Sequence, residues 1–121
     1  MEERAKHKLS AILRADVKEY SRLMGEDELS TVRTLEAYRE MIMDVIRNYS
    51  GRVVDSPGDN LLAEFTSVVD AMESAVEIRN KLRTEDAELP ENRRMEFRIG
   101  IDFFIEPGKQ EEMVIKGGIC K

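Results

Sequence analysis

Short apolar runs alternate along the chain with longer segments in which apolar residues recur every three or four positions. Residues 9–17 are mostly apolar and predict a buried strand. Residues 20–24 predict a short helix that ends at Gly25, and residues 26–49 predict a long amphipathic helix. The expected core-facing stripe of this second helix consists of Leu29, Val32, Leu35, Tyr38, Ile42, Val45, Ile46 and Tyr49, with Gly51 as its stop.

A tight turn separates the next two apolar runs. Val53 and Val54 precede it and residues 61–65 follow it, so the segment predicts a β-hairpin. Pro57 fixes φ, Gly58 can adopt positive φ, and the next two residues, an aspartate and an asparagine, tolerate the left-handed region. This hairpin is the expected centre of the domain.

The remaining pattern completes a small α+β domain. Ser67, with an acid three residues later, predicts the start of a helix that continues to Leu82. Residues 84–94 predict a polar loop, residues 95–105 a long strand, residues 107–110 a turn and residues 113–115 at best a short strand. We therefore expect a ferredoxin-like antiparallel sheet with helices packed on one face.

Composition narrows the class of protein. The net charge of −6 argues against a nucleic-acid binder, and no segment approaches the length and apolarity of a membrane span. Cys120 is the single cysteine, and the charged start of the chain does not resemble a signal peptide, so we expect a cytoplasmic protein. Residues 1–8 are expected to form an N-terminal arm, with His7 solvated, and residues 9–121 a single domain.

Two aspartates are the candidate functional residues. Asp16 lies near the end of the first predicted strand, and Asp59 lies in the hairpin turn. Each also has a purely structural explanation, because Asp16 could cap the helix that follows and Asp59 is a common kind of turn residue.

Several segments resemble, in order and spacing, the catalytic domains of bacterial class III adenylate/guanylate cyclases. The similarity covers roughly residues 8–102 and implies a nucleotide cyclase-like fold. Its segments are residues 11–17, 20–28, 51–54, 58–59, 61–65, 89–94 and 97–101.

The resemblance implies a reaction and a set of ligands. These enzymes convert a nucleoside triphosphate, ATP or GTP, into a cyclic monophosphate and pyrophosphate by attack of the ribose 3′-hydroxyl on the α-phosphate. Asp16 and Asp59 fall on the family's two metal-binding positions, for two Mg²⁺ or Mn²⁺ ions. The backbone amides around Val17, Tyr20 and Ser21 match its phosphate-binding loop.

Three positions near this site depart from the family pattern. Asp55 replaces a base-reading lysine and favours guanine, although a turn-side aspartate also has a structural explanation. Glu19 stands where the phosphate loop usually has glycine, and Asn60 where a glycine usually follows the second metal-binding aspartate. A carboxylate at position 19 would repel a triphosphate.

The C-terminal segment departs furthest, which suggests a truncated or degenerate domain. A loose alignment puts Val114 where the base-reading acid belongs, and the ribose-binding Asn and the transition-state Arg are not in this chain, so no catalytic residue is assigned. We expect a cyclase-like domain of weak or no activity alone, which forms a homodimer or a heterodimer with a related cyclase domain. The alternatives are a regulatory module that binds nucleotide or metal or only dimerises, and a truncated gene product without a selected function.

Overall fold

The structure is a computed structural model, and it describes residues 9–105. Four strands and three helices follow one another in the predicted order, so the expected α+β class is confirmed. The elements are β1 (Leu9–Val17), α2 (Tyr20–Glu26), α3 (Glu28–Asn48), β2 (Arg52–Asp55), β3 (Leu61–Phe65), α4 (Val68–Asp86), the short 3₁₀ helix η1 (Glu91–Arg93) and β4 (Phe97–Ile105).

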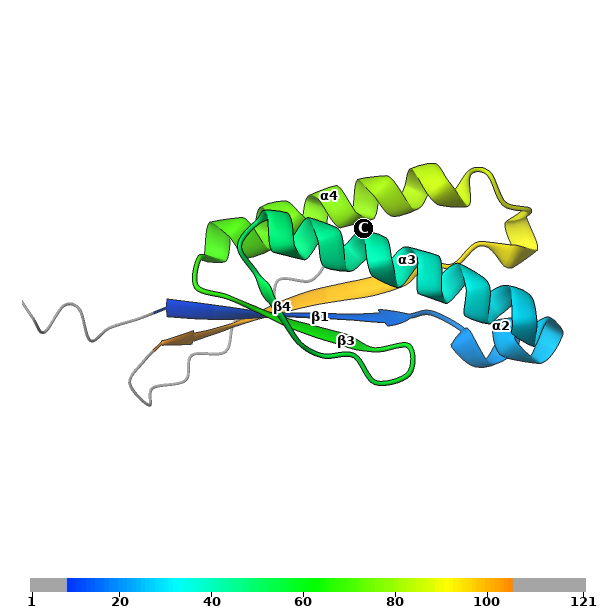
Figure 1. Cartoon of the computed structure of the whole chain (residues 1–121), viewed down its shortest axis with the longest axis horizontal. Coiled ribbons are helices and arrows are strands. Elements are labelled where there is room, and N and C mark those ends of the chain that lie inside the picture. Colours follow the sequence, from blue (N-terminus) through cyan, green and yellow to red (C-terminus); the bar gives the residue numbers. More distant parts are fainter. Residues whose placement is uncertain (1–8, 106–121) are drawn as a thin grey trace, which may run out of the picture.

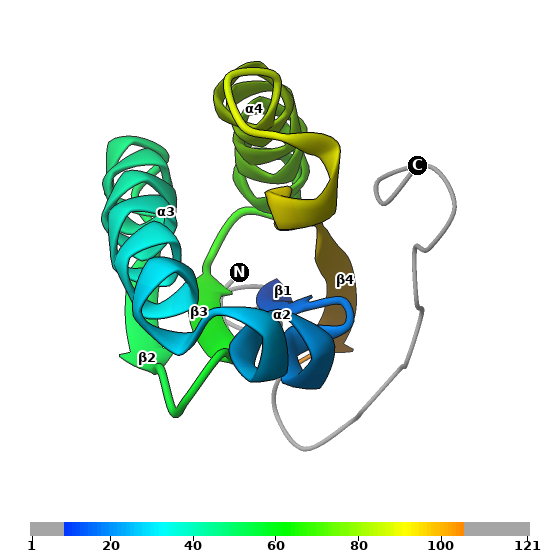
Figure 2. The ribbon, with the colours of Figure 1, turned by 90° about the vertical axis from the view of Figure 1, so that its right-hand side faces the viewer.

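The four strands form one antiparallel sheet in the order β2-β3-β1-β4. β1 therefore lies in the middle, and β4 is an edge strand that pairs with β1 along its whole length. Helices α3 and α4 lie side by side over one face of this sheet, while α2 lies at the end of β1 (Figures 1 and 2). Loops that leave the same end of the sheet are thereby brought together.

The core lies between this sheet and its two long helices. Every second residue of β1 from Ala11 to Val17 is buried, which places the alternate residues, including Asp16, on the face away from α3 and α4. The largest fully buried apolar side chains come from the sheet, both long helices, α2 and the loop before β4: Phe65, Leu13, Leu23, Ile42, Ile46, Ile78, Met95, Ile101 and Val45.

The break between the first two helices differs from the prediction. Gly25 lies inside α2, and the chain bends at Asp27, whose side chain accepts a hydrogen bond from the backbone N–H of Ser30 at 3.1 Å. A capping carboxylate thus starts α3, because it satisfies an amide that has no partner within the helix. Leu29, expected on the core-facing stripe, is 61% exposed since it belongs to this first turn.

The end of α3 also has a different cause from the one expected. Ser50, the residue before the predicted stop at Gly51, adopts the left-handed conformation, with φ of 64°. A Cβ at Gly51 would lie 2.5 Å from the ring of Phe65 and 2.7 Å from Cγ2 of Ile46. Gly51 is therefore required for close packing of the chain against the core, not for the turn itself.

Helix α4 begins as predicted and ends later. The Ser67 side chain accepts from the N–H of Asp70 at 3.1 Å, and the helix continues to Asp86, inside the predicted polar loop. Asp86 is buried, and one of its oxygens accepts from the Tyr38 hydroxyl at 2.6 Å and from the Met95 N–H at 3.1 Å. This carboxylate joins α3, α4 and the loop just before β4.

Several predictions concern residues outside the described part of the chain. These are the N-terminal arm with His7, the turn at 107–110, the short strand at 113–115, and the assignments to Val114 and Cys120. Phe103 and Phe104, near the end of β4, are half-buried.

Candidate functional site

Asp16 occupies the end of the central strand. It lies directly opposite Arg98 in the pairing of β1 with β4, and its Oδ1 accepts a hydrogen bond from Arg98 Nε at 2.8 Å. The side chain of Asp16 is 35% exposed. It therefore does not cap α2, since its carboxylate is engaged across the sheet and α2 has no side-chain cap.

Asp59 is held by a structured turn. Asn60 N–H donates to the Pro57 carbonyl at 2.9 Å, and Gly58 adopts positive φ as predicted. Arg39 of α3 donates to the carbonyl of Gly58, so the long helix fixes the tip of the hairpin. The half-buried Asp59 is thereby oriented by both the turn and α3.

The hairpin turn meets the end of β1 at one hydrogen bond. Asp59 Oδ2 accepts from the backbone N–H of Val17, the residue after Asp16, at 3.2 Å. The hydrogen bond from Arg98 to Asp16 raises the pKa of the Arg98 guanidinium above its usual value, and the charge of Asp59 adds to this effect. Both candidate aspartates thus lie within the electrostatic reach of one arginine at one end of the sheet.

The loop from β1 to α2 has an unusual backbone. Glu19 has φ of 55° and ψ of 38°, a left-handed conformation in which a residue with a Cβ is disfavoured. Its carboxylate accepts from Arg22 Nε at 2.7 Å, which offsets its charge. The Val17 amide donates to Asp59, whereas Tyr20 is half-buried and Ser21 is exposed at the start of the seven-residue α2.

Asp55 is the last residue of β2. It is exposed, and its Oδ1 accepts from the N–H of Ser56 at 2.9 Å. The pairing of β2 with β3 becomes irregular between Val53 and Asp55, which places Asp55 opposite Leu62. The aspartate therefore has a local structural role at the base of the hairpin turn.

The donor set limits the kind of metal that could bind. Within residues 9–105, no cluster of three or more His, Cys, Asp or Glu side chains is arranged to hold a metal ion. Two carboxylates near one strand end nevertheless fit Mg²⁺, which often binds through one or two carboxylates and takes its other ligands from phosphates and water. The residues present fit a metal–nucleotide complex better than a free metal ion.

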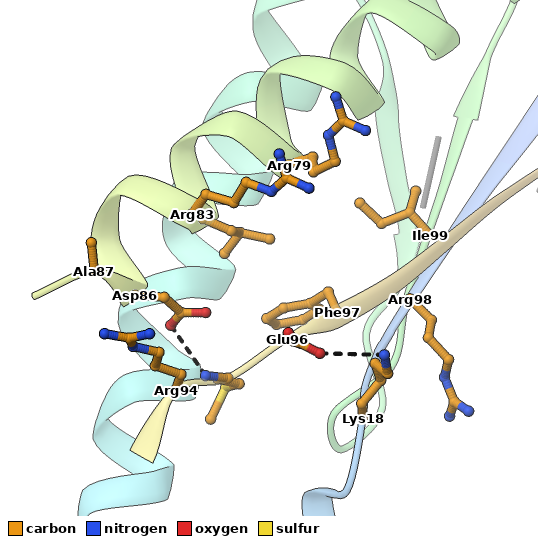
Figure 3. Close-up of a pocket in the computed structure, with 12 residues that line it drawn as sticks. Lys18, Arg79, Arg83, Asp86, Ala87, Arg94, Glu96, Phe97, Arg98 and Ile99 are labelled. Atoms are coloured by element: carbon orange, nitrogen blue, oxygen red, sulfur yellow. Dashed lines mark hydrogen bonds and ion pairs between the residues drawn. The ribbon is translucent and has the colours of Figure 1, made fainter. Parts of the chain in front are cut away.

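A separate hollow lies between α4 and the start of β4, with a volume of about 480 Å³. Figure 3 shows Arg79 and Arg83 on the α4 side and Phe97 and Ile99 on the β4 side, with Arg98 directed away from Phe97. Asp16 and Asp59 do not line this hollow. Arg98 lines the hollow and also contacts Asp16, so the hollow adjoins the site through this arginine.

Sequence reasoning missed three arginines around the site. Arg98 and Arg39 contact the strand end and the turn, and Arg93 holds the α2–α3 corner. Arg93 donates to Thr31 Oγ1 at 2.5 Å and to the Leu23 carbonyl at 3.4 Å, with its side chain 15% exposed. No local pattern signals these contacts, because each joins residues far apart in sequence.

Comparisons with known proteins place this geometry in a family. The chain is 38% identical over 101 residues to the protein named "Putative adenylate cyclase 3" of Rhizobium meliloti (strain 1021), covering 83% of this chain and 17% of that protein. The crystal structure of an adenylate/guanylate cyclase/hydrolase from Silicibacter pomeroyi matches with a TM-score of 0.73 and 31% identity, covering 93% of this chain and 66% of the other. The adenylyl cyclase CyaB from P. aeruginosa shares the fold, with a TM-score of 0.70 and 15% identity, over 93% of this chain and 68% of its own. No family model matches the chain.

The chain belongs to the class III adenylate/guanylate cyclase domain family, as its sequence resemblance indicated. It spans about two thirds of the matched Silicibacter chain and a sixth of the Rhizobium protein. Among residues 9–105, no helix has the length and apolar character needed to cross a membrane.

Proposed function

We propose that this chain binds a nucleoside triphosphate together with Mg²⁺ or Mn²⁺ at the end of β1, as a cyclase-type domain of cyclic-nucleotide signalling. The observation that carries the proposal is the hydrogen bond of 3.2 Å from the Val17 N–H to Asp59. This bond joins the hairpin turn to the residue next to Asp16. It supports a site in which two carboxylates from distant parts of the sequence lie at the same end of the sheet.

Each residue has a defined part in this proposal. Asp16 and Asp59 would hold the metal, which would neutralise charge on the triphosphate and lower the pKa of the attacking ribose hydroxyl. The backbone amides around Tyr20 and Ser21 would contact phosphate oxygens, and that of Val17 would join them once Asp59 turns from this amide to the metal. The pairing of Glu19 with Arg22 reduces the repulsion that this carboxylate would exert on the nucleotide.

Catalysis by the 121-residue chain alone is proposed to be weak or absent. Residues 102–121 include neither Asn nor Arg, the residue types that would bind the ribose and stabilise transition-state charge in the family. Losing one such electrostatic group costs roughly a factor of 10²–10³ in rate. A second candidate function, a regulatory module that binds the nucleotide without converting it, is favoured by the carboxylate of Glu19 in the loop before α2.

Asp55 is proposed to read the base and to favour GTP over ATP. Its ionised carboxylate accepts hydrogen bonds, which guanine N–H groups can donate and adenine N1 cannot. Competition between the two nucleotides for a fluorescent analogue would measure this preference. Asp55→Lys should shift the preference toward ATP, and an unchanged ratio would remove Asp55 from the base site.

A related domain is proposed to complete the site. In the family, active sites form between two domains packed head to tail, and β4 lies at one edge of the described sheet with β1 as its neighbour. Such an edge offers backbone groups for pairing with another chain. Sedimentation analysis should detect dimers, and a monomer at all concentrations would contradict a homodimer.

One experiment tests the metal–nucleotide site and separates the two functions. Mn²⁺ binding is titrated in the presence of non-hydrolysable GTP and ATP analogues, for the wild type and for Asp16→Asn and Asp59→Asn. Asp44→Asn, on the exposed face of α3, is the matched control. Binding that needs Asp16 and Asp59 but not Asp44 supports the proposal, and equal binding by all variants contradicts it. Assay of cyclic products from GTP and ATP then distinguishes a cyclase from a regulatory module.

A further inference from the structure

Arg98 forms a direct cross-strand ion pair with one proposed metal ligand. Its Nε lies 2.8 Å from Oδ1 of Asp16, and the two residues are paired in the β1–β4 register. Both side chains are on the face of the sheet away from the long helices, with exposures of 64% for Arg98 and 35% for Asp16. The arginine can therefore leave the aspartate without disturbing the core.

The same guanidinium also interacts with the second proposed ligand. The charge of Asp59 contributes to the raised pKa of Arg98, after the larger effects of Asp16. Arg98 is thus paired directly with Asp16 and is influenced only weakly by the charge of Asp59. Asp59 has a further partner in the Val17 N–H, so both aspartates have protein partners when no metal is bound.

Two other ion pairs described on this face have different surroundings. Arg14 contacts Asp102 at 2.5 Å, and the Asp102 side chain is only 10% exposed, so that pair compensates a buried charge. Arg52 contacts Glu64 at 2.5 Å between exposed positions of β2 and β3. Among these three described pairs, the Arg98 pair alone engages a candidate metal ligand.

We infer that Arg98 is an internal counter-ion that occupies Asp16 until a metal–nucleotide complex displaces it. This inference rests on the proposed metal site. A divalent cation must compete with the guanidinium for the Asp16 carboxylate, which weakens binding of the metal alone. The arginine released from Asp16 lies beside the site, where its positive charge can attract the negatively charged nucleotide complex. The pair therefore selects the metal–nucleotide complex over the free metal.

The test measures metal binding rather than catalysis. Electron paramagnetic resonance of free Mn²⁺ gives the affinity of the full chain for Mn²⁺ alone, for the wild type, Arg98→Met and Arg98→Lys. Arg98→Met should bind Mn²⁺ roughly threefold to tenfold more tightly at low salt, and high salt should reduce this difference by screening. Arg98→Lys, which keeps the charge, should remain close to the wild type.

Matched variants distinguish a local effect from a change in net charge. Arg52→Met removes one positive charge from an exposed pair near the opposite edge of the sheet, between β2 and β3, and should change Mn²⁺ affinity much less than Arg98→Met. With the GTP analogue present, the wild type should bind Mn²⁺ more tightly than Arg98→Met, because Arg98→Met loses the charge that attracts the nucleotide complex. If circular dichroism shows that Arg98→Met is unfolded, Arg98→Gln provides the same comparison.

Three outcomes would overturn the inference. Equal or weaker Mn²⁺ binding by Arg98→Met overturns it while leaving the proposed function intact, provided that Asp16→Asn still abolishes binding. An equal gain in Mn²⁺ affinity in Arg52→Met also overturns the inference, because it shows that the affinity depends on the net charge of the chain and not on Arg98. Mn²⁺ binding that does not depend on Asp16 in either the wild-type or the Arg98→Met background overturns the proposed metal site as well.

Discussion

The carboxylate of Asp59 accepts a hydrogen bond from the backbone N–H of Val17 and so ties the hairpin turn to the end of the central strand. A charged side chain that accepts from a backbone amide stabilises the loop in which it lies. Asp59 is therefore both a candidate metal ligand and a structural link, and substitutions must separate the two roles.

Asp59→Ala and Asp59→Asn should make that separation. The alanine variant leaves the Val17 N–H without its acceptor and should lower the free energy of unfolding by about 1–2 kcal/mol. The asparagine variant keeps an acceptor oxygen and should lose less stability, whereas both should lose Mn²⁺ binding. Urea unfolding and Mn²⁺ titration measure the two effects, and full Mn²⁺ affinity in folded Asp59→Asn would exclude a ligand role.

Glu19→Gly should stabilise the chain. Glu19 holds a left-handed backbone, which costs a residue with a Cβ roughly 1–2 kcal/mol, and its exposed ion pair with Arg22 offsets only part of this cost. We expect the free energy of unfolding to rise by about 1 kcal/mol. Glu19→Ala is the control, because it removes the same carboxylate but keeps the Cβ, and it should be less stable than Glu19→Gly.

Tyr38 should make stability fall at alkaline pH. Burial raises the pKa of its hydroxyl above the ordinary value of 10.0, and the hydrogen bond to Asp86 raises it further. The folded chain then keeps the Tyr38 proton at a pH where the unfolded chain loses it. The contribution of Tyr38 to the free energy of unfolding is complete below pH 10. Above pH 10 it declines by up to about 1.4 kcal/mol per pH unit.

Urea unfolding between about pH 8 and pH 11 checks this dependence. Tyr38→Phe should be less stable than the wild type at neutral pH, by about 1–2 kcal/mol, and should have a flatter profile above pH 10. Tyr49→Phe is the comparison: the hydrogen bond of its hydroxyl to Glu77 also raises the pKa of Tyr49, but less than burial and Asp86 raise that of Tyr38, so this variant should flatten the profile less. A profile that flattens equally in both variants would argue against Tyr38 as its source.

Two glycine substitutions should have opposite effects on stability. Gly51→Ala places a methyl group 2.5 Å from the Phe65 ring and should cost about 1–3 kcal/mol. Gly25→Ala has no atom within 4 Å of the new methyl and lies inside α2, so it should stabilise the helix by up to about 1 kcal/mol. Thermal unfolding distinguishes them, and equal effects would contradict the assigned packing role of Gly51.

The pattern of apolar residues predicted the elements well because it is a local property. The strand at 9–17 and the cap at Ser67 are confirmed as predicted. Helix ends were less predictable, because they depend on which nearby group forms a hydrogen bond with the backbone amides and carbonyls left without partners at the end of the helix. Asp27 caps α3 and thereby moves the break beyond Gly25, while Ser50 turns the chain so that Gly51 can pack on Phe65.

The candidate site was predictable only in part. Asp16 and Asp59 follow apolar strands in the sequence, and the family resemblance drew attention to them. Arg98 was not found because its contact with Asp16 depends on the register of β1 against β4, which local patterns do not specify. The contact of Arg39 with the turn likewise depends on how α3 lies across the sheet.

The central position of β1 has a consequence for how the chain is made. Its hydrogen-bonding neighbours, β3 and β4, lie far along the sequence, and β4 is the last described element to be synthesised. A ribosome therefore releases the apolar central strand long before its two neighbours exist. Folds dominated by such distant pairings form slowly and leave hydrophobic strands open to association with other chains. Newly made chains should therefore depend on chaperones until translation has passed β4.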